Sequence, residues 1–148
     1  MEGPISDVDG MVIGGHSDKG MLPLTRFASR NSVRVSKFIS EERLNKVLES
    51  TKVGGATLTG MLGTSAWYAP GAAVSSLVHS IACDQKKMFP CSVMLDGEYG
   101  LSDLCIGVPV ILGRNGVEKI VELDLNNEEM QKLNESAEGV KRTNGLLE

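Results

Sequence analysis

In Met11-Val-Ile-Gly-Gly-His16-Ser-Asp18-Lys-Gly-Met-Leu-Pro23-Leu24, an apolar run ends on two glycines and a histidine follows. We expect residues 11–14 to form a short strand and residues 17–20 a polar loop. Glycine at such a point lets the backbone come close to a ligand. Because the unperturbed pKa of histidine lies nearest to neutrality, His16 can transfer a proton in either direction. His16 is therefore our candidate for a catalytic general acid–base.

The segment after this loop predicts a helix with a clear start. Residues 33–39 alternate between apolar and polar side chains, which favours extended backbone. Ser40 then suits a helix N-cap, since a serine hydroxyl can accept a backbone N–H and two glutamates follow in the first turn. We expect Gly54-Gly55 to interrupt this helix, with a second helical piece over residues 56–62.

The remaining pattern predicts one long helix, three strands and a final helix. Pro70 suits the first turn of a helix over residues 71–87, because the first helical N–H groups need no intrahelical partner. Strands are expected at residues 91–95, 105–112 and 120–125, with tight turns at Asp96-Gly97 and Asn115-Gly116. A final helix over residues 127–142 would carry Met130, Leu133 and Ala137 on one face. This order predicts an α+β fold, an antiparallel sheet with packed helices, rather than repeating βαβ units.

Composition and charge exclude several classes of function. The 148 residues suit one domain, residues 1–148, and a net charge of −4 with a pI near 5.2 argues against nucleic acid or an anionic membrane as a partner. The chain has no apolar run long enough to span a membrane, and its N-terminus lacks the pattern of a signal peptide. Three cysteines without a CxxC pair indicate reduced, buried thiols. We therefore expect a soluble, cytoplasmic protein, and with only two histidines we expect no metal site.

Each histidine also has a structural interpretation. His79 lies between Val78 and Ser80 in an amphipathic helix, and we interpret it as structural. A general base commonly needs a carboxylate that fixes its tautomer. Asp18 is close to His16 in sequence, but we expect it to shape the loop rather than to reach the imidazole. The residues alone thus indicate an α+β domain with one candidate histidine, and they leave its substrate open.

Several motifs, in order along the chain, resemble one enzyme family. Residues 14–18, followed by residues 21–24, resemble the Gly-Gly-His-Gly-Asp…Met-Val-Pro signature of the malate and lactate dehydrogenases. Ser65-Ala-Trp-Tyr-Ala-Pro70 is similar to the Ser-Ala-Phe-Tyr-Ala-Pro segment of the bacterial malate dehydrogenases that are built like lactate dehydrogenase. Residues 40–56, 95–100 and 107–118 look like the helix with Gly-Gly-Ala and the closing strands of that family. The resemblance covers essentially the whole chain and implies the family's C-terminal catalytic domain.

The resemblance also implies how the site would work. His16 would take the hydroxyl proton of malate while hydride passes to NAD, and would return a proton when oxaloacetate is reduced, as in the tricarboxylic acid cycle. Ser65 and Ala66 would line the substrate pocket, where the small Ala66 leaves room for a second carboxylate and favours malate over lactate. Pro70 would pack near the nicotinamide ring. Members of the family assemble as dimers or tetramers, so the resemblance implies a homo-oligomer.

The chain departs from the family pattern in its loop and in what it lacks. Ser17 stands in place of a glycine, and Lys19-Gly20 lengthens the loop beside His16. No GxGxxG motif is present, so we expect no Rossmann domain here and NAD bound mainly by an absent N-terminal domain. We accordingly expect little or no activity from the isolated chain. The alternative hypotheses are an L-lactate or other 2-hydroxyacid dehydrogenase domain and a non-catalytic oligomerisation domain.

Overall fold

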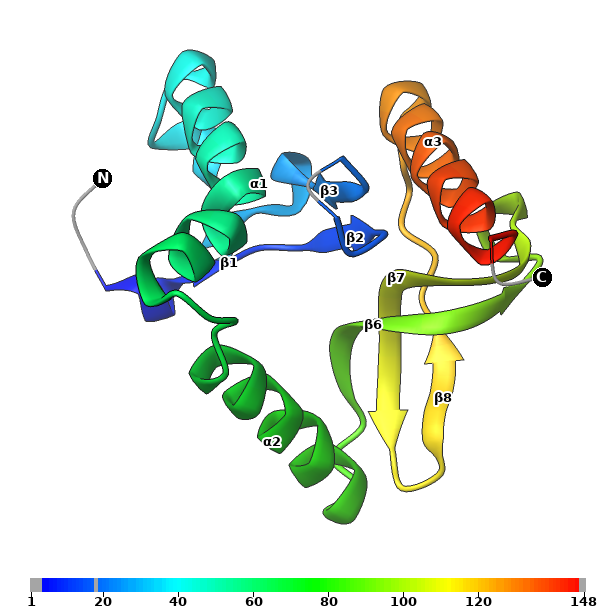
Figure 1. Ribbon diagram of the computed structural model, residues 1–148. Coiled ribbons are helices and arrows are strands. Elements are labelled where there is room, and N and C mark those ends of the chain that lie inside the picture. Colours follow the sequence, from blue (N-terminus) through cyan, green and yellow to red (C-terminus); the bar gives the residue numbers. More distant parts are fainter. Residues whose placement is uncertain (1–3, 18, 147–148) are drawn as a thin grey trace.

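The computed structural model describes residues 4–17 and 19–146, and its strands form two antiparallel sheets (Figure 1). A small sheet has the order β1 (Val8–Asp9), β4 (Ser29–Arg30) and β5 (Val33–Arg34). The large sheet has the order β3 (Met21–Pro23), β2 (Val12–Gly14), β7 (Ser102–Gly113) and β6 (Lys87–Asp96), with β8 (Gly116–Ile120) paired to β7. Every strand pair within the described residues is antiparallel, which confirms the predicted α+β fold.

The core lies between the large sheet and the last helix, α3 (Asn127–Asn144). Side chains alternate across β7, so that one face is buried from Leu104 to Leu112, while the other face is exposed at Cys105 and half-buried at Gly107 and Ile111. The α3 residues Leu133 and Ala137 lie against that buried face, as their helical spacing predicts. The other buried residues of this core are Ile13, Leu22, Leu24, Leu95, Tyr99, Leu101, Leu104, Ile106, Val108 and Val110.

The start of α3 is fixed by its own residues. Asn126 is the N-cap, and its side chain accepts the Glu129 backbone N–H while the Glu129 carboxylate accepts the Asn126 N–H, a reciprocal capping box. Glu129 also binds Arg26, which lies in the short 3-10 helix η2 (Thr25–Phe27), at 2.7 and 2.9 Å. The predicted helix over residues 127–142 is therefore confirmed, with its end two residues later.

The long helix α1 (Glu41–Leu62) confirms the predicted start and contradicts the predicted interruption. The Ser40 side chain accepts the Arg43 N–H, as expected of an N-cap. The helix continues through Gly54 and Gly55 and ends only at Gly63, which has a left-handed φ of 69°. A helical glycine costs about 1 kcal/mol relative to alanine, which weakens a helix without breaking it. The prediction of two helical pieces was wrong.

The second helix, α2 (Tyr68–Ala82), contains Pro70 in its first turn as predicted but ends earlier than residue 87. Asp84 and Lys86 have positive φ values of 49° and 53°, so the backbone leaves the helix there. From Lys87 onward the chain instead pairs with β7, beginning opposite Leu112. Pairing with β7 therefore ends the helix early, and Lys87, which the sequence pattern assigned to the helix, is the first residue of β6.

The predicted strands at 91–95 and 105–112 form the middle of β6 and β7, whereas two other extended predictions were wrong. Only Val33–Arg34 of the 33–39 segment is a strand, because Val35–Lys37 closes a 3-10 turn, η3, that leads to the Ser40 cap. Instead of the strand predicted at 120–125, the structure has β8 at Gly116–Ile120. Gly113 at the end of β7 pairs with Gly116, so β8 begins directly after a two-residue turn. Two further 3-10 turns are η1 (Ile5–Asp7) and η4 (Glu98–Gly100). No helix in the described part of the chain has the length and apolar character needed to cross a membrane.

Candidate active site

The loop that carries His16 joins β2 to β3, and its two ends lie close together. Gly14 ends β2 with a φ of 94°, a conformation that glycine adopts readily and other residues avoid. It pairs with Met21 on one side and with Gly107 on the other. A Cβ added to Gly14 would collide with the Gly20 carbonyl oxygen, so the glycine in the quoted motif allows the two ends of the loop to meet.

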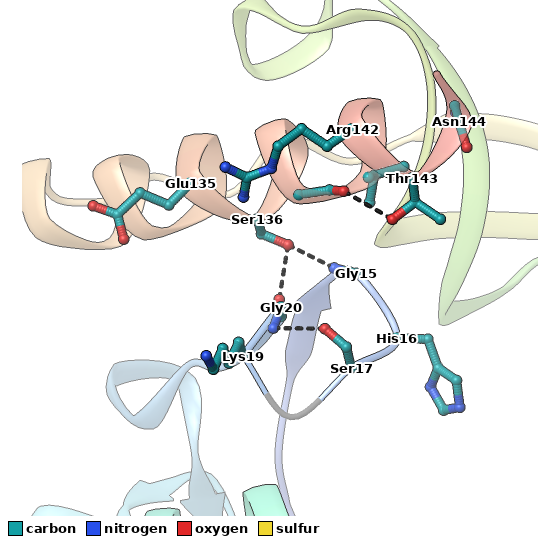
Figure 2. Close-up of a pocket in the computed structure, with 12 residues that line it drawn as sticks. Gly15, His16, Ser17, Lys19, Gly20, Glu135, Ser136, Arg142, Thr143 and Asn144 are labelled. Carbon is teal, nitrogen blue, oxygen red and sulfur yellow. Dashed lines mark hydrogen bonds between the residues drawn. The ribbon is translucent and has the colours of Figure 1, made fainter. Parts of the chain in front are cut away.

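His16 itself is exposed and borders two pockets. Its ring points away from α3, as the close-up shows (Figure 2). A pocket of about 310 Å³ lies between the loop and α3, and a second of about 400 Å³ lies against the large sheet. The imidazole thus faces solvent, while the adjacent Gly15 is half-buried.

The α3-side pocket contains the hydrogen bonds that shape the loop. Ser136, a buried residue of α3, accepts the Gly15 N–H at 2.8 Å and donates to the Gly20 carbonyl oxygen at 2.8 Å (Figure 2). The Ser17 hydroxyl accepts the Gly20 N–H at 2.9 Å. Sequence reasoning missed Ser136, and the only signal was a small polar residue beside Ala137 on the apolar face of a helix. Asp18 lies outside the described residues.

The sheet-side pocket is lined by two cysteines, which correct the predicted burial of all three. All three are free thiols, but Cys83 and Cys105 are exposed and Cys91 is half-buried. Cys105 lies between the buried Leu104 and Ile106, and alternation along β7 turns it outward. Burial raises the pKa of the Cys91 thiol, so it stays protonated and is a poor nucleophile at neutral pH.

The other candidate residues lie apart from His16 in this chain. Ser65 and Ala66 belong to the connection between α1 and α2, and Pro70 lies in the first turn of α2. Neither pocket that borders His16 is lined by any of these three residues. The structure therefore does not bring them together with the histidine.

His79, the second histidine of the chain, lines neither of the two pockets that border His16. His79 is exposed on α2, where the Cys83 sulfur lies 3.9 Å from its Nδ1 atom. Residues 4–17 and 19–146 contain no group of three or more histidine, cysteine, aspartate or glutamate side chains that could hold a metal ion. His16 remains the candidate that both the motif and the exposed loop position support.

Comparison with known proteins identifies the class to which this fold and loop belong. Residues 4–144 match the lactate/malate dehydrogenase alpha/beta C-terminal domain, and the chain belongs to that family. This result confirms the resemblance drawn from the sequence motifs.

Three similar proteins show how far the similarity in sequence and structure extends. The malate dehydrogenase of Bacteroides thetaiotaomicron is 65% identical over 142 residues, which are 96% of this chain and 45% of the relative. The solved malate dehydrogenase of Salinibacter ruber is 42% identical with a TM-score of 0.90, covering 94% of this chain and 45% of that one. The lactate dehydrogenase of Eimeria maxima, solved with NADH and oxamate, is 38% identical with a TM-score of 0.91, covering 96% and 46%. This chain thus spans about half the length of the relatives it matches.

Proposed function

We propose that this chain is the substrate-side half of an NAD-dependent malate dehydrogenase and that His16 is its general acid–base. The observation that carries the proposal is the placement of His16. It is an exposed imidazole on a short loop whose flanking backbone is held by the buried Ser136. A fixed backbone with a free ring suits proton transfer, because the transfer needs an imidazole at a defined position near its substrate.

In malate oxidation, the imidazole would accept the proton of the substrate hydroxyl, and NAD, when bound, would accept the hydride. In the reverse direction, protonated His16 would return the proton to the carbonyl oxygen of oxaloacetate. The N-termini of α1 and α3 are occupied by the capping side chains of Ser40 and Asn126. The N-terminus of α2 has no side-chain cap, but no GxGxxG turn precedes it, so these residues do not form the glycine-rich cradle that an NAD pyrophosphate needs. The cofactor would be held mainly by a part of the enzyme outside these 148 residues.

Ser65 and Ala66 would form part of the wall of the substrate pocket, and Pro70 would lie on the nicotinamide side. Because these residues do not line the pockets at His16, they would complete the site only in the assembled enzyme. The small side chain of Ala66 leaves room for the second carboxylate of malate. That room favours malate over the alternative, L-lactate or another 2-hydroxy acid.

A second candidate function is self-association, and the exposed helices favour it. Residues of α1 are nowhere buried, and the exposed apolar side chains of α2 include Val74 and Val78 at 57% and 56%. Exposed apolar side chains gathered on a helix are typical of an interface. We propose that the enzyme is a homo-oligomer, a dimer or a tetramer, in which these helices are covered.

A hybrid enzyme tests the proposed function. In it, residues 4–144 of this chain replace the matching part of the Bacteroides thetaiotaomicron malate dehydrogenase. We expect the hybrid to oxidise NADH with oxaloacetate, to prefer oxaloacetate to pyruvate, and the isolated 148-residue chain to show little or no turnover. Turnover by the isolated chain, or preference of the hybrid for pyruvate, would contradict the proposal.

A further inference from the structure

We propose that Ser136 of α3 is the positioning residue for the His16 loop. Its single hydroxyl joins the first and the last residues of the loop and so sets where the histidine backbone lies. This inference rests on the proposed acid–base role of His16, but the structural link it describes can be tested separately. Ser136 does not touch the reacting atoms and acts only through the loop.

The link uses one hydroxyl both as a donor and as an acceptor. Gly15, which directly precedes His16, donates its N–H to Ser136 Oγ at 2.8 Å, and Ser136 Oγ donates to the Gly20 carbonyl oxygen at 2.8 Å (Figure 2). A serine hydroxyl carries one donor hydrogen, and here it is given to Gly20. One atom on a helix far along the sequence therefore closes the loop at both ends.

The position of that atom is fixed by the core. Ser136 is 6% exposed and lies between Leu133 and Ala137, which are fully buried. The same helix is anchored at its start by the capping box and by the contact between Arg26 and Glu129. Gly15 and Gly20 are only half-buried at the wall of the α3-side pocket, so loss of the hydroxyl would leave their backbone groups to water, which cannot hold the loop ends in position.

The glycines of the loop allow this approach. A Cβ built on Gly14, Gly15 or Gly20 would lie 3.2, 3.3 or 3.3 Å from Ser136 Oγ, closer than ordinary van der Waals contact. Gly14 is also required by its φ of 94° and Gly20 by the nearby Ser17 hydroxyl, but a side chain at any of the three positions would crowd the Ser136 hydroxyl as well. Gly20 is also part of the Lys19-Gly20 extension, so the link accommodates the longer loop of this chain.

Ser17 supports the same arrangement from within the loop. Its hydroxyl accepts the Gly20 N–H at 2.9 Å, and its N–H donates to the Gly15 carbonyl oxygen at 3.0 Å. Both backbone groups of Gly20 are therefore bonded, one to Ser17 and one to Ser136. The backbone on either side of His16 is held while the ring stays exposed.

Ser80 provides a matched control for a merely structural role. It is also buried on a helix, and its hydroxyl donates to the Leu112 carbonyl oxygen at 2.8 Å. Its partner lies on β7, and it makes no bond to the His16 loop. Ser136→Ala and Ser80→Ala each remove one buried hydroxyl, and only Ser136→Ala removes a link to the histidine.

The first test measures amide hydrogen exchange in the 148-residue chain by NMR. We expect Ser136→Ala to speed exchange of the Gly15 amide by about tenfold, as for loss of one hydrogen bond, and Ser80→Ala to leave it unchanged. Equal Gly15 exchange in the two variants would overturn the proposed link. Neither result depends on catalysis.

The second test measures the kinetics of the hybrid enzyme. We expect Ser136→Ala to lower kcat at least about tenfold with KM little changed, because a displaced histidine affects the chemical step more than substrate binding. Ser136→Thr, which keeps a hydroxyl, should recover part of that loss. An unchanged kcat in Ser136→Ala, with a melting temperature lowered as in Ser80→Ala, would show a structural role only and overturn the positioning role. Full turnover in a His16→Asn hybrid would instead contradict the proposed function. The hydrogen-bond link from Ser136 to the loop would then be tested by the Gly15 amide exchange alone.

Discussion

At the scale of single residues, Glu129 holds together three parts of the chain. Its carboxylate accepts two hydrogen bonds from the Arg26 guanidinium and one from the Asn126 N–H. The hydrogen bonds from Arg26 hold the pKa of Glu129 below its usual range. Although Arg26 is half exposed, the Glu129 side chain is only 13% exposed, so the pair is less screened than an ordinary surface ion pair.

We predict that Glu129→Gln lowers the free energy of unfolding by about 1 kcal/mol at neutral pH. Because the pKa of Glu129 is depressed in the folded chain, the contribution of the carboxylate is present above its unfolded pKa of about 4.3 and is lost as the pH falls through the folded value. The difference between the variant and the parent should therefore shrink in acid. Urea unfolding at several pH values measures it.

Glu128→Gln is the control for this prediction. Glu128 pairs with Lys132 at 2.6 Å, but its side chain is 75% exposed, so its loss should have little effect on stability. Equal destabilisation by the two variants, or a Glu129→Gln effect that does not vary with pH, would show that the contact between Arg26 and Glu129 has no special role.

Residues also differ in how far the sequence reveals them. His16 could be predicted because its signal is local: a strand, two glycines and a histidine follow one another. Ser136 could not, since its partners are 121 and 116 residues away and a small polar residue on a helix predicts no particular contact. The exposure of Cys83 and Cys105 was missed for the same reason, because an apolar neighbourhood in sequence does not fix the face on which a side chain lies.

At the scale of elements, α1 shows that a helix can continue through residues with low helix propensity. Gly54 and Gly55 lie within the 22-residue helix, and a Cβ added at either would meet nothing within 4 Å. Helix starts were predictable, since Ser40 caps α1 through a local contact. Helix ends and strand bounds were not, because pairing between β6 and β7 decides where α2 stops.

We predict that Gly54→Ala and Gly55→Ala each stabilise the chain by about 0.5–1 kcal/mol, because alanine restricts the unfolded backbone and fits the helix without a clash. Thermal unfolding followed by circular dichroism measures the effect. Gly63→Ala is the opposing control: the position is equally open, but its φ of 69° disfavours alanine, so this variant should be destabilised. Destabilisation by the α1 substitutions would mean that the helix is not continuous in solution.

At the scale of the whole molecule, α3 is anchored in the core, while α1 and α2 lie to the left of α3 in Figure 1 and α1 contributes no buried residue. The α+β class and the antiparallel sheet could be predicted from the order of patterns along the chain. How Ser65, Ala66 and Pro70 meet His16 could not, because the chain spans about 45% of the length of its relatives. Their proposed roles therefore belong to the assembled enzyme.

The most direct test of the central claim is the turnover of the hybrid enzyme with His16→Asn, beside His79→Asn as the matched control. If His16 is the general acid–base, kcat for oxaloacetate reduction should fall by roughly 10²–10⁴-fold while the oligomeric state is unchanged. His79→Asn removes the other histidine of the chain and should keep kcat within about twofold of the parent hybrid. A His16→Asn hybrid that turns over as fast as the His79→Asn hybrid would contradict the account.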